Sequence, residues 1–270
     1  MMKLDLGFNL GHEVKVETNR LERHWNKKLS RDSLNPYPLA PKDLVKMGLV
    51  NPENYALENQ ALSSFRNSMM EKELTRLSSK TEFTNLDFPE IKVFGIGLAR
   101  DLGWIEEAIR LGFFVSAYDV SSVACDLLSS VTEKLPRKRI QINTGEIEAW
   151  WARIEADANR TMVYHVAQFI QILKKTEMRR LMHRMMVLLD NRPLGIAPSL
   201  YVVHPFEKDN CGPRKWGGIS FPYGVEWGDT IPYSEDELLD AMGKRKVKMD
   251  LLGVHPYFHQ IYSFLKIQCG

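Results

Sequence analysis

The sequence has few cysteines, and no two of them lie close together. The three are Cys125, Cys211 and Cys269, and none belongs to a CxxC motif. An odd number of widely spaced cysteines argues against a disulfide framework, and no set of zinc ligands stands out. The sequence therefore predicts neither a disulfide-stapled secreted domain nor a metal site.

The chain also lacks a strong charge of one sign and a long apolar run. Its formal net charge is only +2 over 270 residues, and no long basic run appears, which argues against a nucleic-acid partner. No uninterrupted apolar stretch is long enough to span a bilayer, and the N-terminus lacks the apolar core of a signal peptide. We expect a cytoplasmic protein that does not bind membranes.

What is present is an ordinary globular composition, with 44% hydrophobic and 26% charged residues, so a sizeable core can form. Residues 1–88 are polar, and prolines interrupt their helical patterns, as in NPENY at 51–55. Apolar residues recur there at roughly helical spacing, at Leu57, Leu62, Phe65, Met69 and Leu74. We expect residues 1–88 to form a helical extension or cap and residues 89–270 to form the main α/β domain.

From residue 91 onward, short apolar strands alternate with longer helical patterns. The predicted strands are 92–97, 113–119, 139–145, 161–169 and 194–206. This alternation predicts parallel strands joined by right-handed crossovers, with helices on both faces of the sheet. Two further segments near the C-terminus, VKMDLLGVHP and FHQIYSFLKIQ, predict a closing antiparallel pair.

Local signals mark several helix ends and one long loop. Gly112 follows a helical pattern as a C-terminal glycine does, and Ser121 or Ser122 is placed to cap the next helix. Ser234 and Glu237 have the spacing of a capping box. Just before Ser234, residues 207–233 are rich in Gly, Pro and aromatics. We expect a loop with a hairpin there, and such long loops are often functional.

A glycine turn follows the first predicted strand. Gly95 and Gly97 flank one residue, so the backbone can bend sharply and approach a ligand closely. The helix that follows points its free N–H groups at the same place. Arg100 occupies the third glycine position of a dinucleotide-binding motif. A GxG pair alone also occurs for purely steric reasons.

Asp119 ends the second predicted strand, about 20 residues after the turn, where a carboxylate can accept two hydrogen bonds from a ribose diol. The alternative is that Asp119 caps the next helix together with Ser121. The preceding glycine turn favours the ribose interpretation.

Residues from about 91 to 206 resemble the class I S-adenosylmethionine-dependent methyltransferases, most of all those that act on small molecules. The resemblance lies in GIGLARDLGW, AYDVS, INTGEIE and VYHVAQFIQIL, and the closing VHPYFHQIYSFLKI suits the reversed last strand of that family. It implies a Rossmann-like doubly wound α/β fold with a mostly parallel sheet and a reversed last strand, plus the helical extension. It also implies S-adenosylmethionine as cofactor and a small-molecule methyl acceptor.

The resemblance implies a set of cofactor contacts: Gly95, Gly97, Ala99, Asp119, Val120, Glu146, His165 and Val166. Two positions depart from the family pattern. Val93 stands where an acidic residue often lies, and Ala99 replaces the third small residue, a glycine. Glu146 could equally be a solvent-facing residue at a helix start, and His165 a hydrogen-bonded structural histidine. Trp150 and Trp151 either cover the adenine or pack in the core.

Three histidines near the later strands are candidate bases for methyl transfer to a hydroxyl or amine: His204, His255 and His259. No spacing proves a dyad with a carboxylate, so a structural role stays open for each. The HPxxH pattern at 255–259 offers only two metal ligands, which is weak evidence for a metal. Four aromatics in the long loop are candidates to line the acceptor pocket: Trp216, Phe221, Tyr223 and Trp227.

Two alternatives to a methyltransferase stay open. A nicotinamide-dependent oxidoreductase also suits a glycine turn followed by Asp119, although the third glycine is missing. A protein that kept the fold without catalysis is the second, and Val93 is its best argument. For residues 1–88, the alternative to a cap is a dimerisation arm, which would make the protein a homodimer.

Overall fold

A computed structural model describes most of the α/β region and parts of the N-terminal extension. The described residues are 22–23, 26, 45–46, 51–80, 89–96, 99–145, 147–156, 160–167, 170, 173, 175–190, 197–207, 215–216, 219–220, 233, 235–243, 247–257 and 260–270.

Seven strands form one sheet in the order β3-β2-β1-β4-β5-β9-β8. Their bounds are β1 Glu90–Phe94, β2 Phe114–Asp119, β3 Ile140–Thr144, β4 Thr161–Ala167, β5 Ser199–Glu207, β8 Val247–Tyr257 and β9 Gln260–Cys269. Strands β1 to β5 pair in parallel, and β9 runs antiparallel to both β5 and β8. The predicted mostly parallel sheet with a reversed last strand is confirmed.

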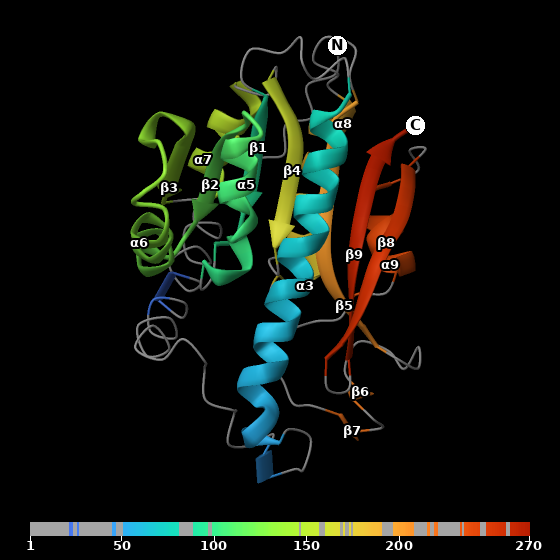
Figure 1. Cartoon of the computed structure of the whole chain (residues 1–270). Coiled ribbons are helices and arrows are strands. Elements are labelled where there is room, and N and C mark those ends of the chain that lie inside the picture. The colour runs from blue at the N-terminus through green and yellow to red at the C-terminus, as the bar shows by residue number, and fades with distance from the viewer. Residues whose placement is uncertain are drawn as a thin grey trace.

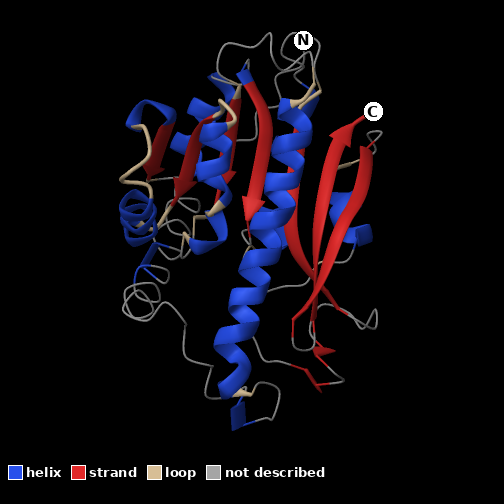
Figure 2. Cartoon of the chain, in the orientation of Figure 1, coloured by secondary structure: helices blue, strands red, loops and turns tan. Residues whose placement is uncertain are grey.

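Helices cover both faces of this sheet, as Figures 1 and 2 show. Their bounds are α3 Pro52–Ser78, α5 Trp104–Arg110, α6 Ser122–Val131, α7 Ile147–Ala156, α8 Lys175–Asp190 and α9 Glu235–Ala241, with short 3-10 helices η1 Arg100–Leu102 and η2 Arg137–Arg139. Buried side chains of α3, α5 and α6 join one core cluster, and those of α7, α8 and α9 join the other. The doubly wound architecture is therefore confirmed.

Local chemistry explains where several helices begin and end. The Ser121 side chain accepts a hydrogen bond from the Ala124 N–H, so Ser121 caps α6. Gly112 has a φ of +94°, the left-handed conformation that ends α5. Asn51 caps α3, and Pro52 stands at its first turn, where a missing N–H costs nothing. The NPENY segment therefore starts a helix rather than only separating two.

Helix α3 buries a stripe that differs in part from the predicted one. The buried residues are Tyr55, Asn59, Leu62, Ser63, Arg66, Met70, Leu74 and Leu77. Leu57, predicted to belong to the stripe, is 65% exposed because it lies on the other side of the helix. Leu62, Met70 and Leu74 share a core with β1 and α5. The predicted division at residue 88 stays a prediction, and residues 1–50 are the part that can still form a separate cap.

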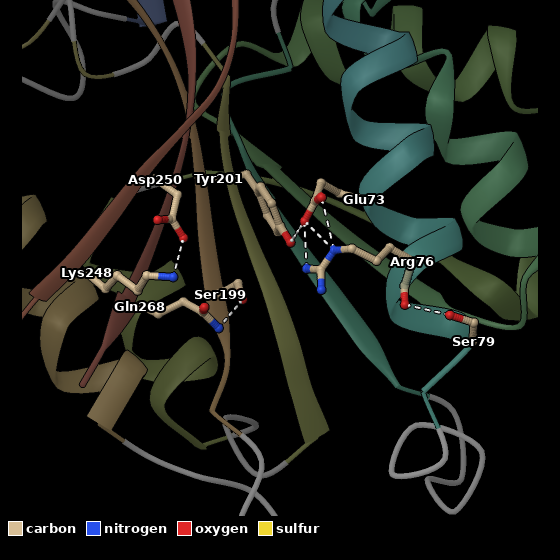
Figure 3. A network of polar contacts seen from close by, with 8 residues as sticks. All are labelled: Glu73, Arg76, Ser79, Ser199, Tyr201, Lys248, Asp250 and Gln268. Atoms are coloured by element: carbon tan, nitrogen blue, oxygen red, sulfur yellow. Dashed lines mark hydrogen bonds and ion pairs between the residues drawn. The ribbon is translucent and has the colours of Figure 1, made fainter.

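The C-terminal half of α3 is fastened to the sheet by a polar cluster, drawn in Figure 3. The Tyr201 hydroxyl on β5 donates to Oε2 of Glu73 at 2.8 Å, and Arg76 pairs with the same carboxylate at 2.8 Å. Burial opposes the charge on Glu73, but the hydrogen bonds from Arg76 and Tyr201 outweigh it and lower its pKa. We call Glu73, Arg76 and Tyr201 the amino-end clamp, because Tyr201 lies near the amino end of β5.

The methionine-rich helix α8 packs in the core. Met178, Met182, Met185 and Met186 are all fully buried in the cluster beneath α7 and α9. Flexible thioether side chains fill irregular gaps between a helix and a twisted sheet. Two ion pairs then join α8 to α9 at the surface: Lys175 with Glu237, and Arg179 with Asp240.

Candidate functional site

The carboxyl ends of β1 to β5 meet at one edge, the lower edge of the sheet in Figure 1. Ligands of open α/β sheets bind at this edge, next to the strand where the order reverses, which here is β1. The strand pair β6 Lys215–Trp216 and β7 Ile219–Ser220, which confirms the predicted hairpin, lies beyond the same edge. The start of α3 also projects past it.

The turn after β1 is tied to the end of β2 by two hydrogen bonds. The Gly95 N–H donates to the Tyr118 carbonyl at 3.0 Å, and the Ile96 N–H donates to Oδ2 of Asp119 at 2.6 Å. Gly95 has a φ of +83°, a conformation that glycine adopts without steric cost. Ala99 also lies in the left-handed region, at +63°, where an alanine is strained by roughly 1–2 kcal/mol. The surrounding hydrogen bonds therefore hold the backbone of the turn in left-handed conformations at Gly95 and Ala99.

Asp119 connects this turn to the start of α6. Its second oxygen, Oδ1, accepts from the Ser121 N–H at 2.8 Å, and the side chain is largely buried. Ser121, rather than Asp119, is the N-cap residue of α6. The Asp119 carboxylate therefore organises the backbone of the turn and of the start of α6, and its contact with a ribose stays a prediction.

The N-terminal segment reaches the same place. The Ser121 hydroxyl donates to Oδ1 of Asn26 at 2.7 Å, which joins a residue of the extension to the cap of α6. In Figure 1 the dark-blue segment that contains this residue lies below α6, at the carboxyl edge. Part of residues 1–50 therefore lies beside Asp119.

An aromatic layer supports the turn from the opposite face of the sheet. The Phe94 ring stacks on Trp151 at 5.7 Å between centroids, and Tyr118 lies 6.1 Å from Trp150. Both tryptophans are almost fully buried in the core cluster of α7 and α8. Of the two interpretations of Trp150 and Trp151, core packing is the one that these contacts favour.

His165 on β4 faces the layer of α3 and α5. It pairs in register with Val93 of β1, and its ring meets Trp104 edge-on at 5.3 Å. The side chain is 1% exposed, and its Nδ1 has no hydrogen-bond partner. Burial, helped by the Arg66 charge and opposed by Asp101, lowers the pKa of His165 to about 3, so the ring is neutral at pH 7.

His204 on β5 faces the other layer. Its Nε2–H donates to the Tyr233 carbonyl at 3.0 Å, and the two rings stack at 6.2 Å. Burial lowers the pKa of His204 to about 4. The Tyr233 hydroxyl in turn donates to the Leu173 carbonyl at 2.6 Å. His204 thus anchors the chain just after the long loop at 207–233, which is a positioning role.

His255 on β8 lies on the α3 side of the sheet, opposite to His204. Its ring stacks on Phe65 of α3 at 5.3 Å, and the side chain is partly exposed. Burial lowers the pKa of His255, while the Glu58 carboxylate on α3 opposes this shift. The structure therefore separates His204 from His255 and brings a carboxylate near His255.

Several predicted residues lie outside the described part of the chain, or have side chains that do. Gly97, Glu146, His259, Phe221, Tyr223 and Trp227 are outside it, and Trp216 is described only as part of β6. Their roles stay predictions. Val120 and Val166 are buried in the core cluster beneath the aromatic layer.

One pair at this edge was missed by the sequence analysis. Arg66 of α3 bonds Oδ2 of Asp101 in η1 at 2.6 Å, and its guanidinium lies 5.1 Å from the centre of the Tyr262 ring. A signal was available, since Leu62, Arg66 and Met70 recur every four residues, which places an arginine within an apolar stripe. We call Arg66 and Asp101 the carboxyl-end pair.

No described helix combines the length and the apolar character needed to cross a membrane. Within the same residues, no three His, Cys, Asp or Glu side chains lie together in a way that could hold a metal ion.

Comparisons with known proteins identify the fold. No protein-family model matches the chain, and no curated protein matches it in sequence. Among solved structures, the chain is similar to geranyl diphosphate C-methyltransferase from Streptomyces coelicolor A3(2), with a TM-score of 0.57, 11% identity and coverage of 94% of this chain and 97% of that one. That enzyme was solved with Mg²⁺, geranyl diphosphate and S-adenosyl-L-homocysteine.

The chain is also similar to magnesium protoporphyrin IX methyltransferase from Synechocystis PCC 6803, with a TM-score of 0.58, 12% identity and coverage of 94% of this chain and 99% of that one. That structure holds S-adenosylhomocysteine, and another of the same enzyme holds S-adenosylmethionine. At these identities the similarity shows a shared fold.

Proposed function

From the class I S-adenosylmethionine-dependent methyltransferase fold that the chain shares with these enzymes, we propose that it transfers a methyl group from S-adenosylmethionine to a small-molecule acceptor. The observation that carries the proposal is the Asp119 carboxylate, bonded to the Ile96 N–H of the turn at 2.6 Å at the carboxyl edge of the sheet. A carboxylate in this place is suited to the hydroxyls of a ribose. Both structural neighbours were solved with this cofactor or its product.

The residues around Asp119 suit the rest of an adenosyl group. We expect Val120 and Glu146 to lie beside the adenine, since they follow the carboxyl ends of β2 and β3. Gly95, Gly97 and Ala99 would let the backbone approach the cofactor closely. His165 and Val166 support the site from β4, and the buried His165 ring packs behind the turn next to Trp104. When bound, the cofactor supplies a methyl group on a strongly electrophilic sulfonium.

This chain's part in the reaction is to align the acceptor and to remove its proton. Of the three predicted bases, His255 suits this role best, because it is partly exposed, it lies near the Glu58 carboxylate, and burial keeps its ring neutral at pH 7. His204 is fully buried and already donates to Tyr233, so we assign it to anchoring the loop. His259 follows β8 in the chain, outside the described residues, and stays a second candidate.

The acceptor pocket is proposed to lie between the long loop and the N-terminal segment. Trp216 is on β6 beyond the carboxyl edge, and Phe221, Tyr223 and Trp227 follow it in the chain. The Asn26–Ser121 hydrogen bond supports a cap formed by residues 1–50 over the same edge. Such a cap would exclude water from the acceptor.

Calorimetry with S-adenosylmethionine, S-adenosylhomocysteine and NAD tests the proposal against both alternatives. A methyltransferase binds the first two, an oxidoreductase binds NAD, and a non-catalytic relative binds none of them. The reversed β9 between β5 and β8 favours the methyltransferase, because the neighbours with this complete fold are methyltransferases.

Replacing Asp119 tests the proposed ribose contact, with a second aspartate as a matched control. Asp119→Ala should weaken S-adenosylhomocysteine binding by about 1–3 kcal/mol, because charge-assisted hydrogen bonds to the ribose are lost. Asp126→Ala, an exposed carboxylate on α6, should leave the affinity unchanged and serves as the control. Equal affinities for the two variants in calorimetry would exclude the ribose assignment.

A further inference from the structure

The end of β1 carries no acidic side chain at the position where the resemblance implies one. Val93 is fully buried, pairs in register with Ala117 and His165, and belongs to the core beneath α3 and α5. S-adenosylmethionine and S-adenosylhomocysteine both end in an α-ammonium and an α-carboxylate. The carboxyl end of β1 therefore offers no carboxylate to that ammonium.

The segment that follows β1 places a different carboxylate, that of Asp101, at the same edge of the sheet. Asp101 lies in η1, two residues after Ala99, and the Leu102 N–H closes the turn onto the Ala99 carbonyl at 2.9 Å. The Asp101 side chain is 15% exposed, so it is held within the protein but not sealed inside it. The carboxylate therefore belongs to the same short segment as the glycine turn.

Arg66 holds this carboxylate from the α3 side. Its Nη1 lies 2.6 Å from Oδ2 of Asp101, its side chain is only 3% exposed, and its guanidinium lies over the Tyr262 ring. Taking an arginine and an aspartate out of water is costly, and apolar residues of similar size often stabilise a fold better. The interruption of an apolar stripe by Arg66 is therefore better explained by a binding role than by stability.

We propose that Asp101 and Arg66 bind the amino-acid end of the cofactor, in place of the carboxylate that the carboxyl end of β1 lacks at Val93. This inference rests on the proposed function. The Asp101 carboxylate accepts hydrogen bonds from the α-ammonium, and the Arg66 guanidinium donates to the α-carboxylate. A guanidinium and a carboxylate are the side-chain groups that pair best with an α-carboxylate and an α-ammonium.

The competing explanation is that the pair only fastens α3 to the turn. Neighbouring contacts already do this: Oδ1 of Asn67 accepts from the Trp104 N–H at 3.3 Å, and the Asn67 amide packs against Gly103. A purely structural pair would affect every ligand of the turn equally. A pair that binds the amino-acid end would affect only ligands that possess that end.

The test compares S-adenosylhomocysteine with 5′-methylthioadenosine, which keeps the adenosyl group but has no amino-acid end. Calorimetry on the full chain measures both ligands with wild type, Asp101→Asn and Arg66→Lys. Glu107→Gln is the control, since it alters an exposed ion pair with Arg110 on the neighbouring helix α5. Thermal unfolding shows which variants are folded, and if Asp101→Asn is unfolded, Arg66→Lys decides.

We expect Asp101→Asn and Arg66→Lys to weaken S-adenosylhomocysteine binding at least about tenfold, since charge-assisted bonds are lost. Their affinity for 5′-methylthioadenosine should stay within about twofold of wild type, and Glu107→Gln should change neither ligand. An equal loss for both ligands, or no loss for either, would overturn the inference while leaving the proposed function intact. A wild type that binds neither ligand would instead refute the proposed function, and this inference with it.

Discussion

Helix α3 is held at its middle and near its C-terminal end by similar chemistry in different surroundings. The amino-end clamp joins Glu73 to Arg76 and to the Tyr201 hydroxyl, and the Arg76 side chain is 41% exposed (Figure 3). In the carboxyl-end pair, Arg66 is 3% exposed beside the glycine turn. In the ion pair of the clamp only Glu73 is largely buried and Arg76 stays in water, whereas both members of the carboxyl-end pair are largely buried, at the edge where ligands of this fold bind.

The comparison distinguishes residues that stabilise the fold from residues that lie where a ligand is expected to bind. Residues of the clamp lie near the amino ends of the strands, so their loss should change unfolding and leave ligands unaffected. Residues of the pair, and the chain that precedes α3, lie at the carboxyl edge, where their loss should change ligand binding or turnover.

Removing residues 1–50 is expected to have the largest effect. The truncated chain keeps Asn51, the cap of α3, so the helix and its contacts should persist. If residues 1–50 form a cap, the truncated protein keeps its oligomeric state and binds S-adenosylhomocysteine, but loses turnover because the acceptor pocket is open to water.

Light scattering and a methyl-transfer assay measure the two outcomes. A change of oligomeric state, from dimer to monomer, with turnover intact would show that residues 1–50 are a dimerisation arm and would refute the cap. Asn26→Ala sharpens the test, because it removes the hydrogen bond to Ser121.

Replacing each of two arginines of α3, Arg66 and Arg76, should give the next largest effect. Arg66→Met leaves the Asp101 carboxylate poorly solvated and should lower the free energy of unfolding by about 3 kcal/mol. Arg76→Met removes an exposed partner and should cost about 1 kcal/mol or less. Urea unfolding of both variants measures the difference. Equal losses of unfolding free energy would contradict the contrast between the carboxyl-end pair and the amino-end clamp.

Tyr201→Phe removes one hydroxyl from the amino-end clamp and changes little else. The Glu73 carboxylate loses one hydrogen bond, so the free energy of unfolding should fall by about 1 kcal/mol. The affinity for S-adenosylhomocysteine should be unchanged, since the site lies at the opposite end of the strands. A loss of affinity in calorimetry would show that the clamp also shapes the site.

The smallest expected effect is on the pH dependence of stability. The pKa of Glu73 is lowered from 4.5 in the folded protein, so its stabilisation is present above pH 4.5 and is lost as the pH falls through the lower folded pKa. Glu73→Gln cannot titrate, so the stability difference between wild type and Glu73→Gln should shrink on acidification. Urea midpoints measured from pH 6 to pH 3 check this, and a constant difference would speak against the lowered pKa.

Features set by neighbouring residues could be predicted from the sequence. The strand and helix order, the Ser121 cap and the Gly112 helix end depend on short patterns, and the structure has them where the patterns place them. The resemblance to the methyltransferase family also predicted the reversed strand β9.

Features that depend on which face of a helix or strand a side chain occupies were harder to predict from the sequence. Leu57 fits a helical stripe in the sequence but is exposed, because Tyr55 and Asn59 are the residues buried in that part of the helix instead. His204 and His255 were grouped as candidate bases, yet strand alternation places them on opposite faces. The Arg66–Asp101 pair was missed because the two residues are far apart in the sequence and meet only when α3 packs over the turn.

A crystal structure of the full chain with S-adenosylhomocysteine tests the central claim most directly. We predict that the ribose hydroxyls lie within hydrogen-bond distance of the Asp119 carboxylate, and that the amino-acid end lies against Asp101 and Arg66. S-adenosylhomocysteine bound away from the carboxyl edge of the sheet, or bound with its ribose far from Asp119, would contradict the account.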